Sequence, residues 1–126
     1  MNAQKKKIKV LIVDDEDLIR DCIAYLLKKR GFISEGASNG KEALEKVKRD
    51  KPDIIILDIV MPVLNGLQVC KQLKENPDTQ DIPIILLSSH EPLGQIIRGM
   101  PGAAIKYIEK PCDLEYLLTE INNLIL

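Results

Sequence analysis

Acidic, hydroxyl and basic side chains follow four separate apolar segments of the 126-residue sequence. They are Asp14 and Asp15 after residues 8–13, Asp58 after residues 54–57, Ser88 after residues 84–87 and Lys110 after residues 104–109. If these segments are parallel strands of one sheet, their carboxyl ends meet at one edge, where such sheets bind ligands. Two like charges 4 Å apart repel by about 4 kcal/mol at an effective dielectric of 20, so three carboxylates there require cations.

Lys110 supplies one positive charge, and a hard divalent cation would supply the rest. Oxygen ligands without Cys or His favour Mg²⁺, or Mn²⁺, over zinc. A carboxylate beside such an ion can attack phosphorus and form an aspartyl-phosphate, while the metal and the lysine neutralise charge on the phosphoryl oxygens. The hydroxyl of Ser88 is expected to hydrogen-bond to the phosphoryl group. The pattern therefore predicts a phosphoryl-transfer site with Asp58 as the nucleophile.

Each of these features also has a simpler interpretation. An acidic pair after a strand often only stabilises the following helix N-terminus, Asp58 could cap a turn, and Ser88 could be a helix N-cap. A lysine followed by proline is often a solvated turn. Complementary chemistry at four separate strand ends is much harder to explain in this way, and it favours the functional interpretation.

The elements needed to position these residues are visible in the apolar pattern. Five apolar, β-branched segments alternate with five helical segments, which predicts an α/β fold with a five-stranded parallel, doubly wound sheet between helices on both faces. The common strand order for five strands is 2-1-3-4-5. The segment 32–37 is the weakest strand and is expected near an edge. The segment 90–103 is the least regular, because Gly94, Gly99 and Pro101 interrupt any helix there.

The expected helices have recognisable ends and apolar faces. Asn39 and Glu42 form a predicted capping box, Asp113 is expected to cap the last helix, and Gly31 ends the first. Leu18, Cys22, Ile23 and Leu27 are among the residues that recur at helical spacing in the first helix. Cys22 and Cys70 are therefore expected to be buried thiols.

Bulk properties exclude several classes of protein. The length and 45% apolar content fit a single domain over residues 1–126, with residues 1–7 as a flexible basic tail. A net charge of −1 gives no electrostatic argument for binding nucleic acid or membranes. Three widely spaced cysteines fit neither a disulfide framework nor a zinc site. There is no membrane-spanning or signal segment, so we expect a cytoplasmic protein.

The sequence resembles the receiver domains of two-component response regulators, including the chemotaxis regulators, over nearly its whole length. The matching motifs are Val13-Asp14-Asp15-Glu16, Leu57-Asp58-Ile59-Val60-Met61-Pro62 with Gly66 beyond, Leu87-Ser88-Ser89 and Tyr107-Ile108-Glu109-Lys110-Pro111. The resemblance implies a flavodoxin-like three-layer sandwich. It also implies a phosphoprotein of a phosphorelay and not an enzyme beyond its own phosphotransfer and slow autodephosphorylation.

The resemblance assigns roles to individual residues. Asp58 would be the phosphoacceptor, Asp15 and the backbone carbonyl of Val60 would bind Mg²⁺ with it, and Asp14 would help through water. Lys110 would contact the phosphoryl group, ahead of a cis Lys110-Pro111 bond. Ser88 and Tyr107 would form a switch pair, in which the hydroxyl moves toward the phosphate and the ring turns inward.

The resemblance also implies partners. The donor would be the phosphohistidine of a sensor histidine kinase or of a phosphotransfer domain. Phosphorylation would reshape the face formed by the fourth helix, fifth strand and fifth helix, which a downstream protein reads or through which two copies pair. Direct binding of nucleic acid or membrane by this domain is not expected. A stand-alone receiver and a part of a longer regulator both fit the sequence.

Three other interpretations compete. A Mg²⁺-dependent phosphatase of the haloacid dehalogenase type would place a second aspartate two residues after the nucleophile, where this chain has Val60. A flavin or nucleotide module would need a glycine- or hydroxyl-rich loop where Asp14 and Asp15 stand. The third alternative is a receiver-like binding module that works without phosphorylation, although all five key positions are filled.

Overall fold

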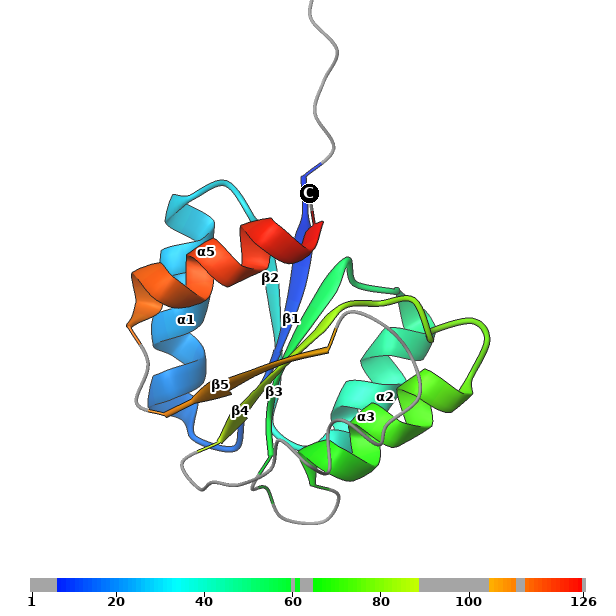
Figure 1. Ribbon diagram of the computed structural model, residues 1–126. Helices are drawn as coiled ribbons and strands as arrows, with labels where there is room; N and C mark the ends of the chain where they lie inside the picture. Colours follow the sequence, from blue (N-terminus) through cyan, green and yellow to red (C-terminus); the bar gives the residue numbers. More distant parts are fainter. Residues whose placement is uncertain (1–6, 60, 62–64, 89–104, 111–112, 126) are drawn as a thin grey trace, which may run out of the picture.

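Five parallel strands form the single sheet of the structure, a computed structural model that describes residues 7–59, 61, 65–88, 105–110 and 113–125. The strands are β1 (Lys9–Val13), β2 (Ile33–Ala37), β3 (Ile54–Asp58), β4 (Ile84–Ser88) and β5 (Ile105–Glu109). Their order is β2-β1-β3-β4-β5 (Figure 1), so the predicted order and the edge position of β2 are confirmed. All described pairs are parallel, which brings the carboxyl ends of the strands to one edge.

Helices cover both faces of this sheet. They are α1 (Asp17–Lys29), α2 (Gly40–Arg49), α3 (Gly66–Glu75) and α5 (Leu114–Ile125). Figure 1 shows α1 and α5 on one face and α2 and α3 on the other. The expected doubly wound, three-layer architecture is therefore confirmed.

Two apolar clusters separate the three layers. Along each central strand the side chains alternate between the faces, as a pleated strand requires. In β3, Ile55 and Leu57 join the cluster beneath α2 and α3, whereas Ile54 and Ile56 join the cluster beneath α1 and α5. Every residue of β3 and β4 is buried, which explains their continuous apolar sequence.

The helix ends follow the sequence signals with one correction. The Asn39 side chain accepts from the Glu42 amide at 2.8 Å, as predicted. The Glu42 carboxylate, however, accepts from the amide of Ser38 at 2.6 Å, so the predicted reciprocal bond to Asn39 was wrong by one residue. A complete capping box joins Asn65 and Gln68 at the start of α3.

The start of α5 and the end of α1 have the residues that the sequence predicts. Asp113 accepts from the Glu115 amide at 2.9 Å and so caps α5. Gly31 follows α1 with a φ of 89°, a left-handed conformation that glycine adopts without steric cost. Among the helices of the described ranges, none is long and apolar enough to cross a membrane.

The predicted apolar face of α1 was partly wrong. Ile23 and Leu27 are buried as expected, but Leu18 is 75% exposed and Cys22 is exposed. Only one side of α1 packs on the sheet and α5, and residues 18 and 22 lie away from that side. Cys70 is buried as predicted, and burial raises the pKa of its thiol to about 11.

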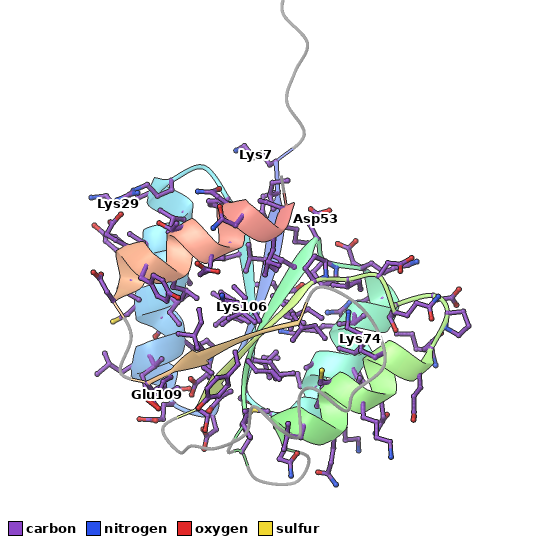
Figure 2. The ribbon with its side chains drawn as sticks, in the orientation of Figure 1. Lys7, Lys29, Asp53, Lys74, Lys106 and Glu109 are labelled. Atoms are coloured by element: carbon purple, nitrogen blue, oxygen red, sulfur yellow. The ribbon has the colours of Figure 1, made fainter. Side chains whose placement is uncertain are left out.

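A lysine that the sequence did not single out is buried in α3. Lys74 (Figure 2) is only 3% exposed, and its ammonium donates to the backbone carbonyls of Gln80 at 2.9 Å and Ile82 at 2.7 Å. Burial lowers its pKa. The side chain ties α3 to the segment that leads into β4.

Several expectations fall outside the described residues. They concern the tail over residues 1–6, the Val60 carbonyl, the irregular segment 90–103 and the Lys110-Pro111 peptide bond.

Candidate functional site

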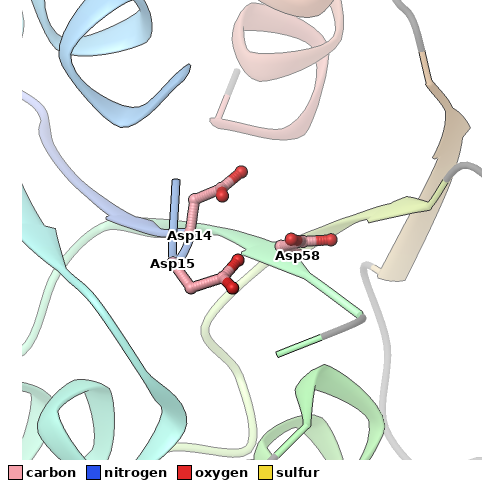
Figure 3. Close-up of side chains that lie close together, drawn as sticks. All are labelled: Asp14, Asp15 and Asp58. Carbon is pink, nitrogen blue, oxygen red and sulfur yellow. The ribbon is translucent and has the colours of Figure 1, made fainter. Parts of the chain in front are cut away.

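Three carboxylates converge at the carboxyl edge of the sheet. Asp14 follows β1, Asp15 is next to it, and Asp58 is the last residue of the adjacent strand β3. One carboxylate oxygen from each lies within 4.8 Å of the other two (Figure 3). The strand order explains this convergence, because β1 and β3 are neighbours although more than forty residues separate them, as a doubly wound sheet requires.

The three acids have different surroundings. Asp14 is 1% exposed and Asp58 is 5% exposed, whereas Asp15 is exposed. Burying two carboxylates side by side is costly unless they are compensated. Lys110 provides part of this compensation: its Nζ lies 3.3 Å from Asp58 Oδ1 and 3.4 Å from Asp14 Oδ2.

The charge balance of the site also acts on Lys110. Burial alone lowers the pKa of its ammonium, but the adjacent carboxylates of Asp58 and Asp14 outweigh burial and hold the pKa above its ordinary value. Lys110 is therefore cationic at neutral pH. One lysine facing three carboxylates leaves a local excess of negative charge.

The end of β4 completes the edge. Ser88 is fully buried, and its carbonyl accepts from the Lys110 amide at 2.6 Å. This hydrogen bond fixes the backbone of Lys110 relative to that of Ser88. Tyr107 is half-buried and packs against the apolar cluster beneath α2 and α3. Ser88 and Tyr107 lie on the same sheet face, because Leu86 pairs with Tyr107 and side chains two residues apart in a strand share a face.

Gly66 allows α3 to begin close to the end of β3. A Cβ atom at this position would lie 2.3 Å from the Asp58 carbonyl oxygen and 2.8 Å from Ile59 Cα, both of them backbone atoms. The Gly66 amide donates to the Ile59 carbonyl at 2.9 Å. The glycine therefore fixes the chain directly after Asp58 against the helix.

Sequence reasoning missed one residue beside the acids. Arg20, in the first turns of α1, donates from Nη1 to the Asp14 carbonyl at 2.6 Å. Its spacing after Asp17 could have indicated an ion pair within the helix, and Nη2 does lie 2.5 Å from Asp17 Oδ1. The contact with the Asp14 backbone has no such signal in the sequence.

The residues at this edge fit a hard divalent cation. All three ligand candidates are carboxylates with oxygens within 4.8 Å of one another. Their excess negative charge over Lys110 gives a reason for a cation to bind, and oxygen-only ligands favour Mg²⁺. Of the sequence-predicted site residues, Asp14, Asp15, Asp58 and Lys110 are brought together here, and Ser88 ends the neighbouring strand.

A doubly wound parallel sheet with an acidic cluster where the strand order reverses defines a receiver-type α/β domain. The family profile described as the response regulator receiver domain matches residues 10–122. The chain belongs to this family, a component of two-component signal transduction. Receiver domains bind Mg²⁺ at an acidic pocket and are not enzymes in the ordinary sense.

Individual relatives agree with this assignment. The chain is 39% identical over 118 residues to the response regulator MprA of Mycobacterium leprae (strain TN), covering 94% of this chain and 51% of that protein. It therefore spans about half the length of the curated relatives it matches.

Solved structures show the same fold. The chemotaxis protein CheY4 of Vibrio cholerae is similar with a TM-score of 0.85 at 30% identity, covering 94% of this chain and 99% of that one. The receiver domain of a signal transduction histidine kinase from Syntrophus aciditrophicus gives a TM-score of 0.83 at 32% identity, covering 93% and 89%.

Proposed function

We propose that this receiver domain accepts a phosphoryl group on Asp58 from a phosphohistidine, with Mg²⁺ bound by Asp14, Asp15 and Asp58. The observation that carries the proposal is the convergence of three carboxylates within 4.8 Å, with the Lys110 ammonium 3.3 Å from Asp58. The donor would be a sensor histidine kinase or a phosphotransfer domain.

The transfer follows from the chemistry of these groups. An oxygen of the Asp58 carboxylate attacks phosphorus, the new P–O bond forms as the P–N bond to the donor imidazole breaks, and that imidazole takes up a proton. Bound Mg²⁺ supplies neutralisation of negative charge on the phosphoryl oxygens. Lys110 stays cationic because its pKa is raised, so it can pair with the same oxygens.

Signal output would use Ser88 and Tyr107. The Ser88 hydroxyl would hydrogen-bond to the new phosphoryl group, and Tyr107, on the same sheet face, would turn inward. A downstream protein would read the changed surface around β5 and α5, or two copies would pair through it. We also propose a cytoplasmic location, where a histidine kinase presents its phosphohistidine.

Phosphoramidate tests this proposal because it offers the same P–N bond as a phosphohistidine. The protein would be incubated with phosphoramidate and Mg²⁺, or with phosphoramidate and EDTA, and its intact mass measured. We expect wild type to gain one phosphoryl group only with Mg²⁺, and Asp58→Asn to gain none.

Asp53→Asn is the matched control. Asp53 lies just before β3, at the opposite end of the sheet from Glu109 (Figure 2), and accepts from the Lys9 amide at 2.8 Å. It should label like wild type. Failure of wild type to gain mass, or equal labelling of Asp58→Asn, would refute the proposal.

A further inference from the structure

We propose that Arg20 is a positioning residue: it holds the turn that carries Asp14 and Asp15 in the shape that binds the divalent cation. Its side chain reaches this position by packing against Gly36. The inference rests on the proposed function, because it takes the acidic cluster as a cation site. It adds a residue of α1 and a residue of the edge strand β2 to that site.

The contacts of Arg20 lie on both sides of the turn. Nη1 donates to the Asp14 carbonyl at 2.6 Å, before the turn, and Nη2 pairs with Asp17 at 2.5 Å, after it. The Arg20 amide also donates to the Glu16 carbonyl at 3.1 Å. One side chain therefore connects the end of β1 to the beginning of α1.

This connection matters most for Asp15, which lies between the two anchored points. The Asp14 carboxylate is itself held, because its Oδ1 accepts from the Glu16 amide at 2.9 Å. Within the described part of the chain, by contrast, no donor hydrogen-bonds to the Asp15 carboxylate, and the side chain is exposed. The direction of the Asp15 carboxylate therefore depends on the backbone that Arg20 fixes.

Gly36 gives the arginine the space to reach this position. A Cβ atom on Gly36 would lie 3.0 Å from Arg20 Cδ and 3.2 Å from Arg20 Nε, so the arginine stem occupies the place of a side chain on β2. Gly36 is itself fixed, because it pairs with Ile12 of β1 and its carbonyl accepts from the Lys46 ammonium. The surface against which the arginine packs is thus held in place by the sheet.

Charge and position predict opposite effects for Arg20. A guanidinium near a cation site repels the cation, so an arginine that acted only through its charge would weaken binding, and its removal would tighten it. An arginine that holds the turn would strengthen binding, and its removal would weaken it. Partners that orient metal ligands typically change metal affinity by about 10–100-fold when mutated.

A titration with Mn²⁺, followed by the EPR signal of the free ion, separates these effects without any phosphorylation. The variants are Arg20→Lys, Arg20→Met and Gly36→Ala, and the unfolding free energy of each is measured in EDTA. We expect about tenfold weaker Mn²⁺ binding in Arg20→Lys and Arg20→Met, as for other residues that orient ligands. Gly36→Ala keeps the charge but shifts the arginine stem, because the new Cβ would lie 3.0 Å from Cδ, so Mn²⁺ binding should weaken. The flexible stem can give way to the Cβ, so the unfolding free energy should not fall.

Arg30→Met is the matched control, because Arg30 follows the far end of α1 and pairs with Glu115 at 2.5 Å. It should bind Mn²⁺ like wild type. The inference would be overturned if the Arg20 variants bound Mn²⁺ as tightly as wild type or more tightly. It would also be overturned if, across all variants, Mn²⁺ affinity fell only in proportion to the unfolding free energy. Either result would leave the proposed function intact. If wild type itself bound no Mn²⁺, the proposed function would fail and this inference with it.

Discussion

At the scale of single residues, the acidic cluster combines two buried carboxylates with an exposed one. Asp14 and Asp58 lie next to Lys110, with ammonium–carboxylate distances of 3.4 and 3.3 Å. Asp15 lies on the solvent side of them. The buried pair is thus partly neutralised within the protein, while Asp15 adds negative charge that only a bound cation would use.

This difference predicts opposite effects of Asp15→Asn with and without metal. In EDTA the variant should be more stable than wild type by about 1 kcal/mol, the repulsion of two charges near 4 Å in water. A cation at a hundred times its dissociation constant should stabilise wild type by about 2.7 kcal/mol, and the variant by much less. Urea unfolding in EDTA and in Mg²⁺ measures both effects.

Asp21→Asn provides the control for this comparison, since Asp21 is an exposed acid of α1 outside the cluster. It should respond to Mg²⁺ like wild type. A response of Asp15→Asn to Mg²⁺ equal to that of wild type would show that Asp15 is not a ligand.

At the scale of elements, the site depends on how closely the helices approach the strand ends. Gly66 places the start of α3 on the backbone of Asp58 and Ile59, and Arg20 ties α1 to β1. The helices are in turn held by their own caps, such as the Asn65–Gln68 capping box. The geometry of the acids is therefore shared among several helix starts.

Gly66→Ala should disturb fold and site together. The added Cβ would meet backbone at 2.3 Å, so α3 must move away from β3, and overpacking of this kind costs about 1–3 kcal/mol. Urea unfolding should show this loss, and labelling of Asp58 should slow. Gly36→Ala is the comparison for stability alone. Its Cβ meets the flexible Arg20 side chain and not backbone, so its unfolding free energy should not fall. Wild-type stability in Gly66→Ala would contradict the close approach.

The start of α2 gives a prediction about pH. The hydrogen bond that the Ser38 amide donates to Glu42 lowers the pKa of this carboxyl below its ordinary 4.5. The ionised carboxylate therefore favours the folded state. This contribution is fully present above pH 4.5 and is lost as the pH falls through the lower, folded-state pKa. Glu42→Gln should therefore be less stable than wild type at neutral pH by up to about 1 kcal/mol.

The difference in unfolding free energy between wild type and Glu42→Gln should shrink as the solution is acidified. Urea unfolding across the acidic pH range measures it. Glu45→Gln, an exposed position on the same helix, should follow wild type throughout. A constant gap at every pH would show that the carboxylate charge has no role in the cap.

At the scale of the whole molecule, topology explains why the residues at the sheet edge could be predicted from the sequence. It also explains why the residues that hold them in place could not. Apolar runs that end in polar residues identify strand ends, and a parallel sheet brings those ends together whatever the details of packing. The convergence of Asp14, Asp15, Asp58 and Lys110 followed from that rule. The fully buried strands β3 and β4 were equally readable from their continuous apolar sequence.

The residues that sequence reasoning missed depend on contacts between elements. Gly36 lies in the segment 32–37, which the sequence marks only as the weakest strand, whereas in the structure it makes room for Arg20 of α1. No sequence signal singled out Lys74, because its burial depends on backbone carbonyls six and eight residues later. Leu18 and Cys22 had helical spacing, but spacing does not show which side of a helix a neighbour covers.

The central claim is that Asp58 carries the phosphoryl group, and chemical trapping in the unmutated protein tests it most directly. The protein would be treated with acetyl phosphate and Mg²⁺, and borohydride would then reduce the acyl phosphate, converting the phosphorylated aspartate to homoserine. Peptide mass spectrometry locates the converted residue. We predict homoserine at position 58, with none when EDTA replaces Mg²⁺. Homoserine at position 14 or 15 instead, or at no position, would contradict the assignment.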